Sequence, residues 1–136
     1  MLLLVINFVF DYNNCMNNVK KIKLRDFEIG GDKLTILAGP CVIETQNVLR
    51  ETAEKLKIIA QKLDINLVFK SSYDKANRSS LTSYRGLGIT RGLEMLADVK
   101  KEFDIPIVTD IHTGEEAFIA SEVADIIQIP AFLCRC

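Results

Sequence analysis

The chain has 136 residues, of which 49% are hydrophobic and 26% charged, and its formal net charge is −1. This composition excludes a disordered chain, and the length suits one domain. The charge balance gives no reason to expect nucleic acid or a membrane as a partner, so phosphate binding would need a local basic cluster. The four cysteines form neither a zinc pattern nor a disulfide framework, which favours a cytoplasmic protein.

The amino-terminal region differs from the rest of the chain. The first ten residues, MLLLVINFVF, are apolar but too short to span a bilayer, and they lack the features of a signal peptide. A polar stretch begins at Met16. We expect residues 1–30 to be an amino-terminal extension, with residues 1–15 as a hypothetical non-native segment, and residues 31–136 to form the folded domain.

The sequence from residue 31 onward alternates short apolar runs with amphipathic stretches. The apolar runs end at turn or polar residues, and the amphipathic stretches repeat apolar residues at steps of three and four. In chain order they predict a strand at 34–38, a helix at 46–63, a strand at 66–69, a polar loop at 70–89, a helix at 90–103, a strand at 105–109, a helix at 114–123 and a strand at 125–129.

Strands that alternate with helices indicate an α/β fold with a parallel sheet. The strands are almost continuously apolar, as expected when both faces of a sheet are covered. The pattern fits either a doubly wound sheet or a (β/α)8 barrel, of which the chain would supply four units. Both folds place their chemistry at the carboxyl ends of the strands.

Polar residues collect just after these strand ends. The first strand is followed by Cys41, the second by Lys70, Ser72, Lys75, Asn77, Arg78 and Ser79, the third by Asp110 and His112, and the fourth carries Gln128 before Pro130, Ala131 and Arg135. Because the ends of parallel strands converge on one rim, we expect an active site there.

The residue types suggest a phosphorylated ligand. Four cations lie within sixteen positions: Lys70, Lys75, Arg78 and Arg85. Cations and hydroxyls can hold phosphate, and polar groups such as Asn77 or Gln128 suit sugar hydroxyls. The alternative is a solvated basic loop. On spacing alone, His112 is interpreted as structural and Cys41 as a buried thiol, since no metal-ligand pattern surrounds them.

Five ordered motifs carry a resemblance to a known family. They are Ala38-Gly-Pro-Cys-Val-Ile-Glu44, Phe69-Lys-Ser-Ser-Tyr-Asp-Lys-Ala-Asn-Arg-Ser-Ser80, Ser83-Tyr-Arg-Gly86, Thr109-Asp-Ile-His112 and Gln128-Ile-Pro-Ala-Phe-Leu-Cys-Arg135. The chain resembles the amino-terminal half of the 3-deoxy-D-manno-octulosonate 8-phosphate synthase (KDO-8-phosphate synthase) family. The resemblance implies a (β/α)8 TIM barrel, here with only its first four β/α units.

The resemblance also implies a reaction. Family members condense phosphoenolpyruvate with D-arabinose 5-phosphate and water, giving 3-deoxy-D-manno-octulosonate 8-phosphate and phosphate for lipopolysaccharide biosynthesis. They are cytoplasmic homotetramers. Because half of the barrel would be missing, we expect no turnover from this chain alone.

The resemblance assigns roles residue by residue. The catalytic residues would be Lys70, near the phosphoenolpyruvate carboxylate together with Ser72, and Lys75, between the two substrates. The residues that contact arabinose 5-phosphate or line the cavity would be Asn77, Arg78, Ser79, Asp110, Gln128, Pro130 and Ala131, with Arg135 reaching the sugar phosphate of a neighbouring subunit.

Cys41 gains a second interpretation from the resemblance. The family has a metal-dependent class with Cys at this position and a metal-independent class with Asn. Cys41 therefore resembles the ligand of a divalent metal ion. Its partners (His, Glu and Asp) would belong to the missing half.

Three positions depart from the family pattern, namely Thr82, Leu87 and Cys136, where the family usually has His, Pro and Gln. A related synthase that uses erythrose 4-phosphate, the 3-deoxy-heptulosonate 7-phosphate synthase, is the enzymatic alternative. That branch typically has Lys-Pro-Arg-Thr at the loop, so Asn77 argues against it. The non-enzymatic alternative is an inactive truncated remnant or an interaction fragment.

Overall fold

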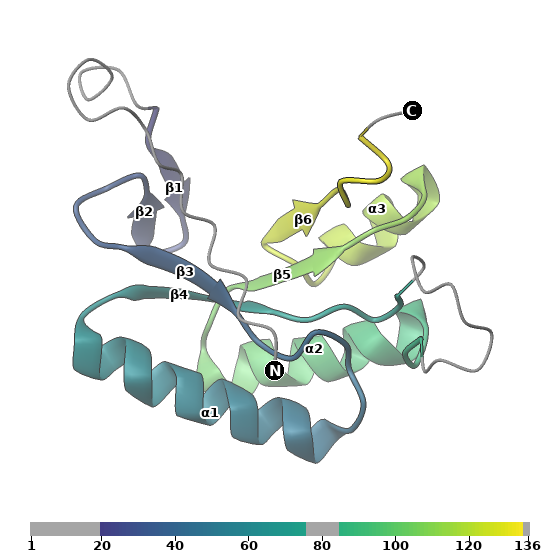
Figure 1. The fold of residues 1–136 in the computed structure, drawn as a ribbon, viewed down its shortest axis with the longest axis horizontal. Coiled ribbons are helices and arrows are strands. Elements are labelled where there is room, and N and C mark those ends of the chain that lie inside the picture. The colour runs from purple at the N-terminus through teal and green to yellow at the C-terminus, as the bar shows by residue number, and fades with distance from the viewer. Residues whose placement is uncertain (1–19, 76–84, 135–136) are drawn as a thin grey trace.

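The computed structural model describes residues 20–75 and 85–134 as a hairpin, a parallel sheet and three helices (Figure 1). The hairpin pairs β1 (Ile22–Leu24) with β2 (Phe27–Ile29) in antiparallel orientation. The sheet then alternates with helices in the order β3 (Thr35–Ala38), α1 (Gln46–Leu63), β4 (Asn66–Lys70), α2 (Ile89–Phe103), β5 (Ile107–Asp110), α3 (Gly114–Ser121) and β6 (Ile126–Gln128).

The predicted alternation of strands and helices is confirmed. The sheet order is β3-β4-β5-β6, and every neighbouring pair is parallel. Element ends differ from the prediction by one or two residues. The third strand begins at Ile107 rather than at 105, because Pro106 has no N–H for the ladder, although its carbonyl still accepts a hydrogen bond from Phe69 N at 2.8 Å.

Two helices begin where the sequence supplies a threonine cap. The Thr45 hydroxyl accepts a hydrogen bond from Val48 N at 3.3 Å, and the Thr113 hydroxyl accepts one from Glu116 N at 3.2 Å. A side-chain acceptor at this position satisfies one of the four free amides of the first turn. The caps fix where α1 and α3 leave the ends of β3 and β5.

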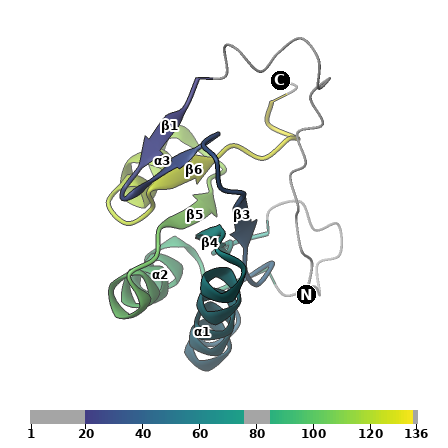
Figure 2. The same cartoon turned by 90° about the vertical axis from the view of Figure 1, so that its left-hand side faces the viewer.

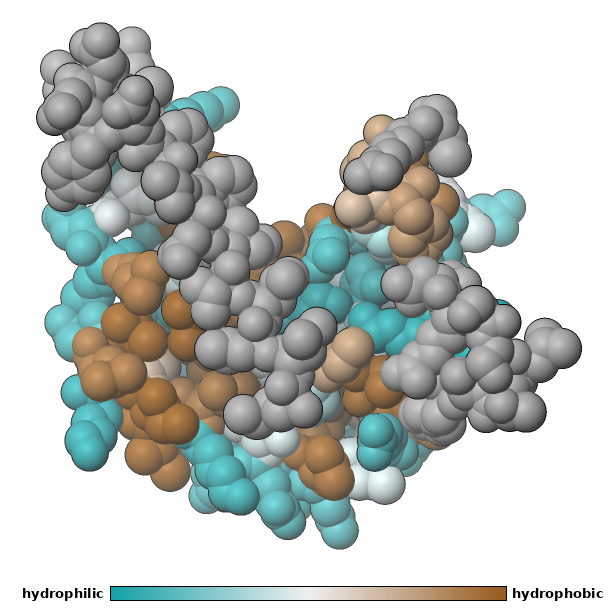
Figure 3. Space-filling model, in the orientation of Figure 1, coloured by the Kyte–Doolittle hydropathy of each residue, from teal (hydrophilic) through white to brown (hydrophobic). Residues whose placement is uncertain are grey.

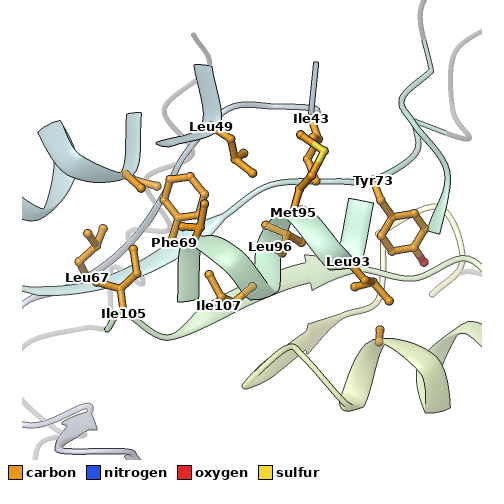
Figure 4. Packing of buried hydrophobic residues seen from close by; sticks show 14 of the residues in the cluster. Ile43, Leu49, Leu67, Phe69, Tyr73, Leu93, Met95, Leu96, Ile105 and Ile107 are labelled. Atoms are coloured by element: carbon orange, nitrogen blue, oxygen red, sulfur yellow. The ribbon is translucent and has the colours of Figure 1, made fainter. Parts of the chain in front are cut away.

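One face of the sheet packs against all three helices. The sheet contributes Phe69 and Ile107, which are fully buried, and the helices contribute Leu49 and Leu96 among others (Figure 4). Each such side chain stabilises the fold by about 1.5–3 kcal/mol relative to an exposed position. The helices therefore cover this face of the sheet, and the opposite face is available for other contacts.

The opposite face of the sheet has two zones. Side chains alternate along each strand, so Val68 and Val108 point away from the helices. They form a second buried cluster with Leu24 of the hairpin, against which Phe27 packs. Figure 2 shows the hairpin and the helices α1 and α2 on opposite sides of the sheet. Two residues further along the same strands, this face carries the polar side chains described below.

The hairpin lies in the range 1–30, which was expected to be an amino-terminal extension. No strand was predicted there, yet β1 and β2 lie inside this range and bury Leu24 against the sheet. The two strands are only three residues long, too short for the periodicity that reveals strands in a sequence. The hypothetical non-native segment, residues 1–15, lies outside the described residues.

Ion pairs also fasten the hairpin region to the helices. Arg25 pairs with Asp104, and Lys33 pairs with Asp64. The two aspartates close α2 and α1 in the left-handed conformation, at helix ends where a negative charge is unfavourable. The cations therefore relieve an unfavourable interaction at each helix end.

Within residues 20–75 and 85–134, no helix combines the length and apolar character needed to cross a bilayer.

Replacement of Leu24 by alanine tests the contribution of the hairpin. Leu24 is 8% exposed, so Leu24→Ala leaves a cavity under Val68 and Val108 and lowers the free energy of unfolding by about 2 kcal/mol. The matched control is Ile22→Ala in the same hairpin, where the side chain is 57% exposed and the loss stays below about 0.5 kcal/mol. Urea denaturation measures both values. Equal losses for the two variants would show that the hairpin does not pack as described.

Candidate active site

Three polar side chains end neighbouring strands on the face opposite the helices. Lys70 is the last residue of β4, Asp110 the last of β5 and Gln128 the last of β6. Asp110 and Gln128 are direct partners in the β5–β6 register. The space-filling view shows hydrophilic residues gathered between the middle of the molecule and the β6–α3 side (Figure 3). The predicted convergence of strand ends is therefore present.

Lys70 and Asp110 form a mostly buried ion pair. Lys70 Nζ lies 3.1 Å from Asp110 Oδ1, and the two side chains are 15% and 9% exposed. Parallel neighbours bring these residues together although 40 positions separate them in the chain. Little water reaches either charge, so each group must face the other. The buried pair therefore fixes the orientation of both side chains.

Ser72 joins a second lysine to this pair. Its hydroxyl oxygen accepts hydrogen bonds from Lys70 Nζ at 2.8 Å and from Lys75 Nζ at 2.7 Å. Ser72 is fully buried and is fixed by its bridge to Val42 and by the bond from Ile43 N to its carbonyl at 3.0 Å. Two ammonium groups thus face one carboxylate, which leaves an excess positive charge suited to an anion.

The surroundings lower the pKa of Lys70. Burial is the main cause, because it disfavours the charged ammonium group, and the nearby Lys75 acts in the same direction. The Asp110 carboxylate opposes them by favouring the ammonium form. Lys70 therefore loses its proton at a lower pH than an ordinary lysine, and the site loses positive charge on the alkaline side.

The pKa of Asp110 is also lowered, for a different balance of causes. Burial by itself would raise it, but Lys70, a hydrogen bond with Ser72 and the charge of Lys75 together favour the carboxylate. Asp110 consequently stays ionised at neutral pH and keeps Lys70 oriented.

Buried hydroxyls and a close backbone contact align the strand ends. Ser71 donates a hydrogen bond to Pro40 O at 2.9 Å, and Thr109 donates one to Ser71 O at 2.9 Å. Gly39 lies so close to β4 that a Cβ atom there would stand 2.0 Å from the carbonyl oxygen of Lys70. These contacts tie β3, β4 and β5 together where the polar side chains begin. Sequence reasoning gave no role to Thr109, because a threonine in an apolar strand carries no distinctive signal.

A second polar cluster lies behind Asp110. Glu116 Oε2 accepts hydrogen bonds from Tyr73 Oη at 2.8 Å and from His112 N at 2.6 Å. The His112 ring lies between two carboxylates, 3.8 Å from Asp110 Oδ2 and 3.5 Å from Glu116 Oε2. The structural interpretation of His112 fits this packing. Glu116 was missed, although the pattern Thr113-x-x-Glu116 is a capping-box signal that places a glutamate at this helix start.

The structure brings together only part of the predicted site. Lys70, Ser72, Lys75 and Asp110 form one cluster, with Gln128 beside Asp110. Pro130 and Ala131 follow β6 in a turn, in which Pro130 O accepts a hydrogen bond from Leu133 N at 3.0 Å and Ala131 O accepts one from Cys134 N at 3.2 Å. Four predicted residues lie outside the described ranges: Asn77, Arg78, Ser79 and Arg135.

Cys41 is an exposed free thiol, which corrects its interpretation as a buried one. It lies close enough to Lys70 to favour the ammonium form of that lysine. Among the described residues, no group of three or more His, Cys, Asp and Glu side chains is arranged to hold a metal ion. The described residues thus provide one candidate donor and do not by themselves fit a complete metal site.

Comparison with known proteins identifies the family of the chain. The model of the DAHP synthetase I family matches residues 14–136. The chain belongs to the DAHP synthetase I family. Family membership agrees with the observed parallel sheet and alternating β/α units.

Curated relatives give a more specific similarity. Proteins named 2-dehydro-3-deoxyphosphooctonate aldolase match from Francisella tularensis subsp. holarctica (50% identity over 115 residues, 84% of this chain and 42% of that protein), from Fusobacterium nucleatum (46% over 121 residues, 88% and 44%) and from Rickettsia canadensis (52% over 117 residues, 85% and 43%). The chain spans about two fifths of the length of these relatives.

Replacement of Asp110 by asparagine tests the buried ion pair. Asp110→Asn leaves the Lys70 ammonium group buried without a counter-charge, which lowers the free energy of unfolding by about 3 kcal/mol at pH 7. The control Asp98→Asn alters an exposed carboxylate of α2 and changes stability by less than about 0.5 kcal/mol.

The pH dependence gives a second readout for Asp110. Because the folded-state pKa of Asp110 is depressed, its stabilising contribution is complete above the unfolded-state pKa of about 3.9 and is lost as the pH falls through the lower folded-state value. The stability difference between wild type and Asp110→Asn therefore shrinks in acid. A difference that stays constant down to strongly acidic pH would contradict the pairing.

Proposed function

We propose that this chain contributes the first four β/α units and part of the active site of a KDO-8-phosphate synthase with a (β/α)8 barrel. The observation that carries the proposal is the cluster of Lys70, Ser72, Lys75 and Asp110 at adjacent strand ends. The sequential parallel strand order, with the helices on one face, supports the barrel. The similarity to proteins named 2-dehydro-3-deoxyphosphooctonate aldolase supports the choice of reaction.

The proposed reaction joins two phosphorylated substrates. A C–C bond forms between phosphoenolpyruvate and the aldehyde carbon of D-arabinose 5-phosphate, while water enters and inorganic phosphate leaves. The enzyme must therefore hold two anions close together and stabilise the oxygen that gains charge at the aldehyde. The excess positive charge around Ser72 suits both tasks.

Lys70 and Lys75 take different roles in this proposal. Lys70 is mostly buried and oriented by Asp110, so we assign it to the phosphoenolpyruvate carboxylate together with Ser72. Lys75 bonds the same hydroxyl and forms no ion pair with a carboxylate among the described residues, so its ammonium group can turn to the aldehyde oxygen. There it would polarise the carbonyl or donate a proton.

The remaining assignments follow the family resemblance. The residues proposed to hold or enclose arabinose 5-phosphate are Asn77, Arg78, Ser79, Asp110, Gln128, Pro130 and Ala131, with Arg135 acting across a subunit contact of a homotetramer. Gln128 is supported by its place beside Asp110 at the strand ends. A cytoplasmic location remains part of the same proposal.

A divalent metal ion is proposed as the cofactor, with Cys41 as one ligand. When bound, such an ion acts as a Lewis acid or a template for water or substrate oxygen. The support is the exposed thiol of Cys41, which follows β3 at the strand-end rim and favours the ammonium form of Lys70. Since the described residues offer one donor of this set, no step of the proposed reaction is derived through the metal.

The erythrose 4-phosphate branch is the alternative within the family. The family description names DAHP synthetase, whereas the similar curated relatives are named for an octonate product. Asn77 in the loop supports the arabinose 5-phosphate branch. An inactive remnant that retains the fold is the non-enzymatic alternative.

Ligand binding to the 136-residue chain tests the proposed function. We expect phosphoenolpyruvate to bind in an NMR titration, and Lys70→Met or Lys75→Met to weaken binding about tenfold or more, because each removes a charged partner. The control is Lys55→Met, whose side chain is 74% exposed on α1 and which leaves the Kd unchanged. Wild-type binding weakens at a lower alkaline pH than expected for an ordinary lysine, because the pKa of Lys70 is lowered.

The same titration separates the alternatives. Preference for arabinose 5-phosphate over erythrose 4-phosphate supports the octulosonate branch, and the reverse preference supports the heptulosonate branch. Equal weakening by Lys55→Met, or no binding of phosphoenolpyruvate by the wild type, would contradict the proposed site.

Metal binding through Cys41 is tested by its thiolate absorption. Addition of Co²⁺ to the wild type is expected to produce a thiolate-to-metal charge-transfer band, because thiolate is a soft ligand for such ions. Cys41→Ser removes the band, while the control Cys134→Ser, which alters another exposed free thiol, retains it. A band that persists in Cys41→Ser would assign the metal to other residues.

A further inference from the structure

Two stretches flanking the loop after β4 are joined by a bidentate ion pair. Arg85 Nε lies 3.0 Å from Asp74 Oδ1, and an Arg85 terminal nitrogen lies 2.7 Å from Asp74 Oδ2. The fork of a guanidinium group matches the two carboxylate oxygens, so this pair fixes direction as well as distance. It connects the residue just before Lys75 to a residue eleven positions later.

Backbone contacts reinforce the same junction. Lys75 N donates a hydrogen bond to Arg85 O at 2.8 Å, and Gly88 N donates one to Tyr73 O at 3.2 Å. Gly86 has a φ of 129°, and a Cβ atom there would stand 2.1 Å from Tyr73 O. Only glycine permits both this conformation and this approach. The stretches 73–75 and 85–88 therefore lie side by side.

The junction determines where Lys75 sits. The Lys75 backbone is held by Arg85 O, and its neighbour Asp74 is held by the Arg85 side chain, while the Lys75 ammonium group bonds Ser72 Oγ at 2.7 Å. A change in the Asp74–Arg85 pair would act on the adjacent peptide and hence on the direction of the lysine side chain. An error of about 1 Å at such a group is enough to impair function strongly.

Arg85 has a different use from the one its charge suggests. In the sequence it counts as one of four cations of a phosphate-binding loop. In the structure Nε and one terminal nitrogen of its guanidinium group, which form one edge of the group, donate to the Asp74 carboxylate, so its positive charge is paired at the junction.

We propose that Asp74 and Arg85 are positioning residues that act as a clamp to hold Lys75 over Ser72. The role assigned to Lys75 rests on the proposed function, whereas the clamp itself is a property of the fold. Arg85 acts through Asp74 and Lys75 and does not bind substrate phosphate.

Hydrogen exchange of the Lys75 amide tests the clamp without any substrate. Its acceptor is a backbone carbonyl, which remains in every side-chain variant. We expect Asp74→Asn and Arg85→Gln each to speed its exchange about fivefold, since a well-formed bidentate pair contributes at the upper end of the range for exposed pairs. Arg85→Lys keeps the charge but loses the fork, so it restores protection only in part. The control Arg91→Gln breaks the exposed Arg91–Glu94 pair on α2 and leaves the Lys75 amide unchanged.

A double-mutant cycle on phosphoenolpyruvate affinity separates a clamp from a ligand. If Arg85 acts through Asp74, each single variant raises the Kd by a similar factor, and Asp74→Asn/Arg85→Gln raises it no further. If Arg85 binds the ligand directly, Arg85→Gln weakens binding, Asp74→Asn does not, and the effects add. The thermal midpoint is followed in parallel and should shift little, because Arg85 is 55% exposed.

The exchange experiment and the double-mutant cycle together distinguish failure of the clamp from failure of the proposed function. Faster exchange of the Lys75 amide together with a non-additive cycle supports the clamp. Unchanged exchange in both single variants, or additive effects on the Kd, overturns it. If the wild type binds no phosphoenolpyruvate but the exchange results hold, the clamp is supported and the proposed function is contradicted.

Discussion

The buried pair of Lys70 and Asp110 is the interaction on which the rest of the site depends. Two opposite charges can be kept out of water only if each remains correctly placed, and the parallel pairing of β4 and β5 provides that placement. Burial lowers the pKa of Lys70, Asp110 works against this effect, and Ser72 shares its hydroxyl between Lys70 and Lys75. The fold therefore maintains a local excess of positive charge in a chain whose net charge is −1.

One face of the sheet stabilises the fold, and the other carries the polar side chains of the candidate site. The first face is largely apolar and packs on α1, α2 and α3, so it stabilises the strands without constraining the other face. The other face is apolar only where the hairpin covers it, around Val68 and Val108, and becomes polar two residues later at Lys70 and Asp110. Contacts at Gly39, Ser71 and Thr109 align the strand ends at this transition, which explains how short strands can hold charged groups in register.

In the loop after β4, contacts outside the sheet hold a site residue in place. Lys75 lies outside regular secondary structure, so no ladder fixes it, and the clamp of Asp74 and Arg85 together with the backbone contact to Arg85 O supplies the constraint. The charge of Arg85 is then part of the scaffold. A cluster of basic residues in a loop sequence therefore does not show which of them bind a ligand. An arginine that is paired with a carboxylate fixes the position of its neighbours and adds little net positive charge.

The sequence by itself determined the alternation of strands and helices, the rim at which polar residues collect and the family resemblance, because periodicity, caps and ordered motifs are local properties. It also predicted Lys70, Ser72, Lys75 and Asp110 as site residues. Only the tertiary structure decided that the hairpin covers the sheet, that Glu116 supports Tyr73 and His112, and that Arg85 turns to Asp74. These outcomes depend on which side chains meet across the fold, and pairing between distant residues leaves no periodic signal in a single chain.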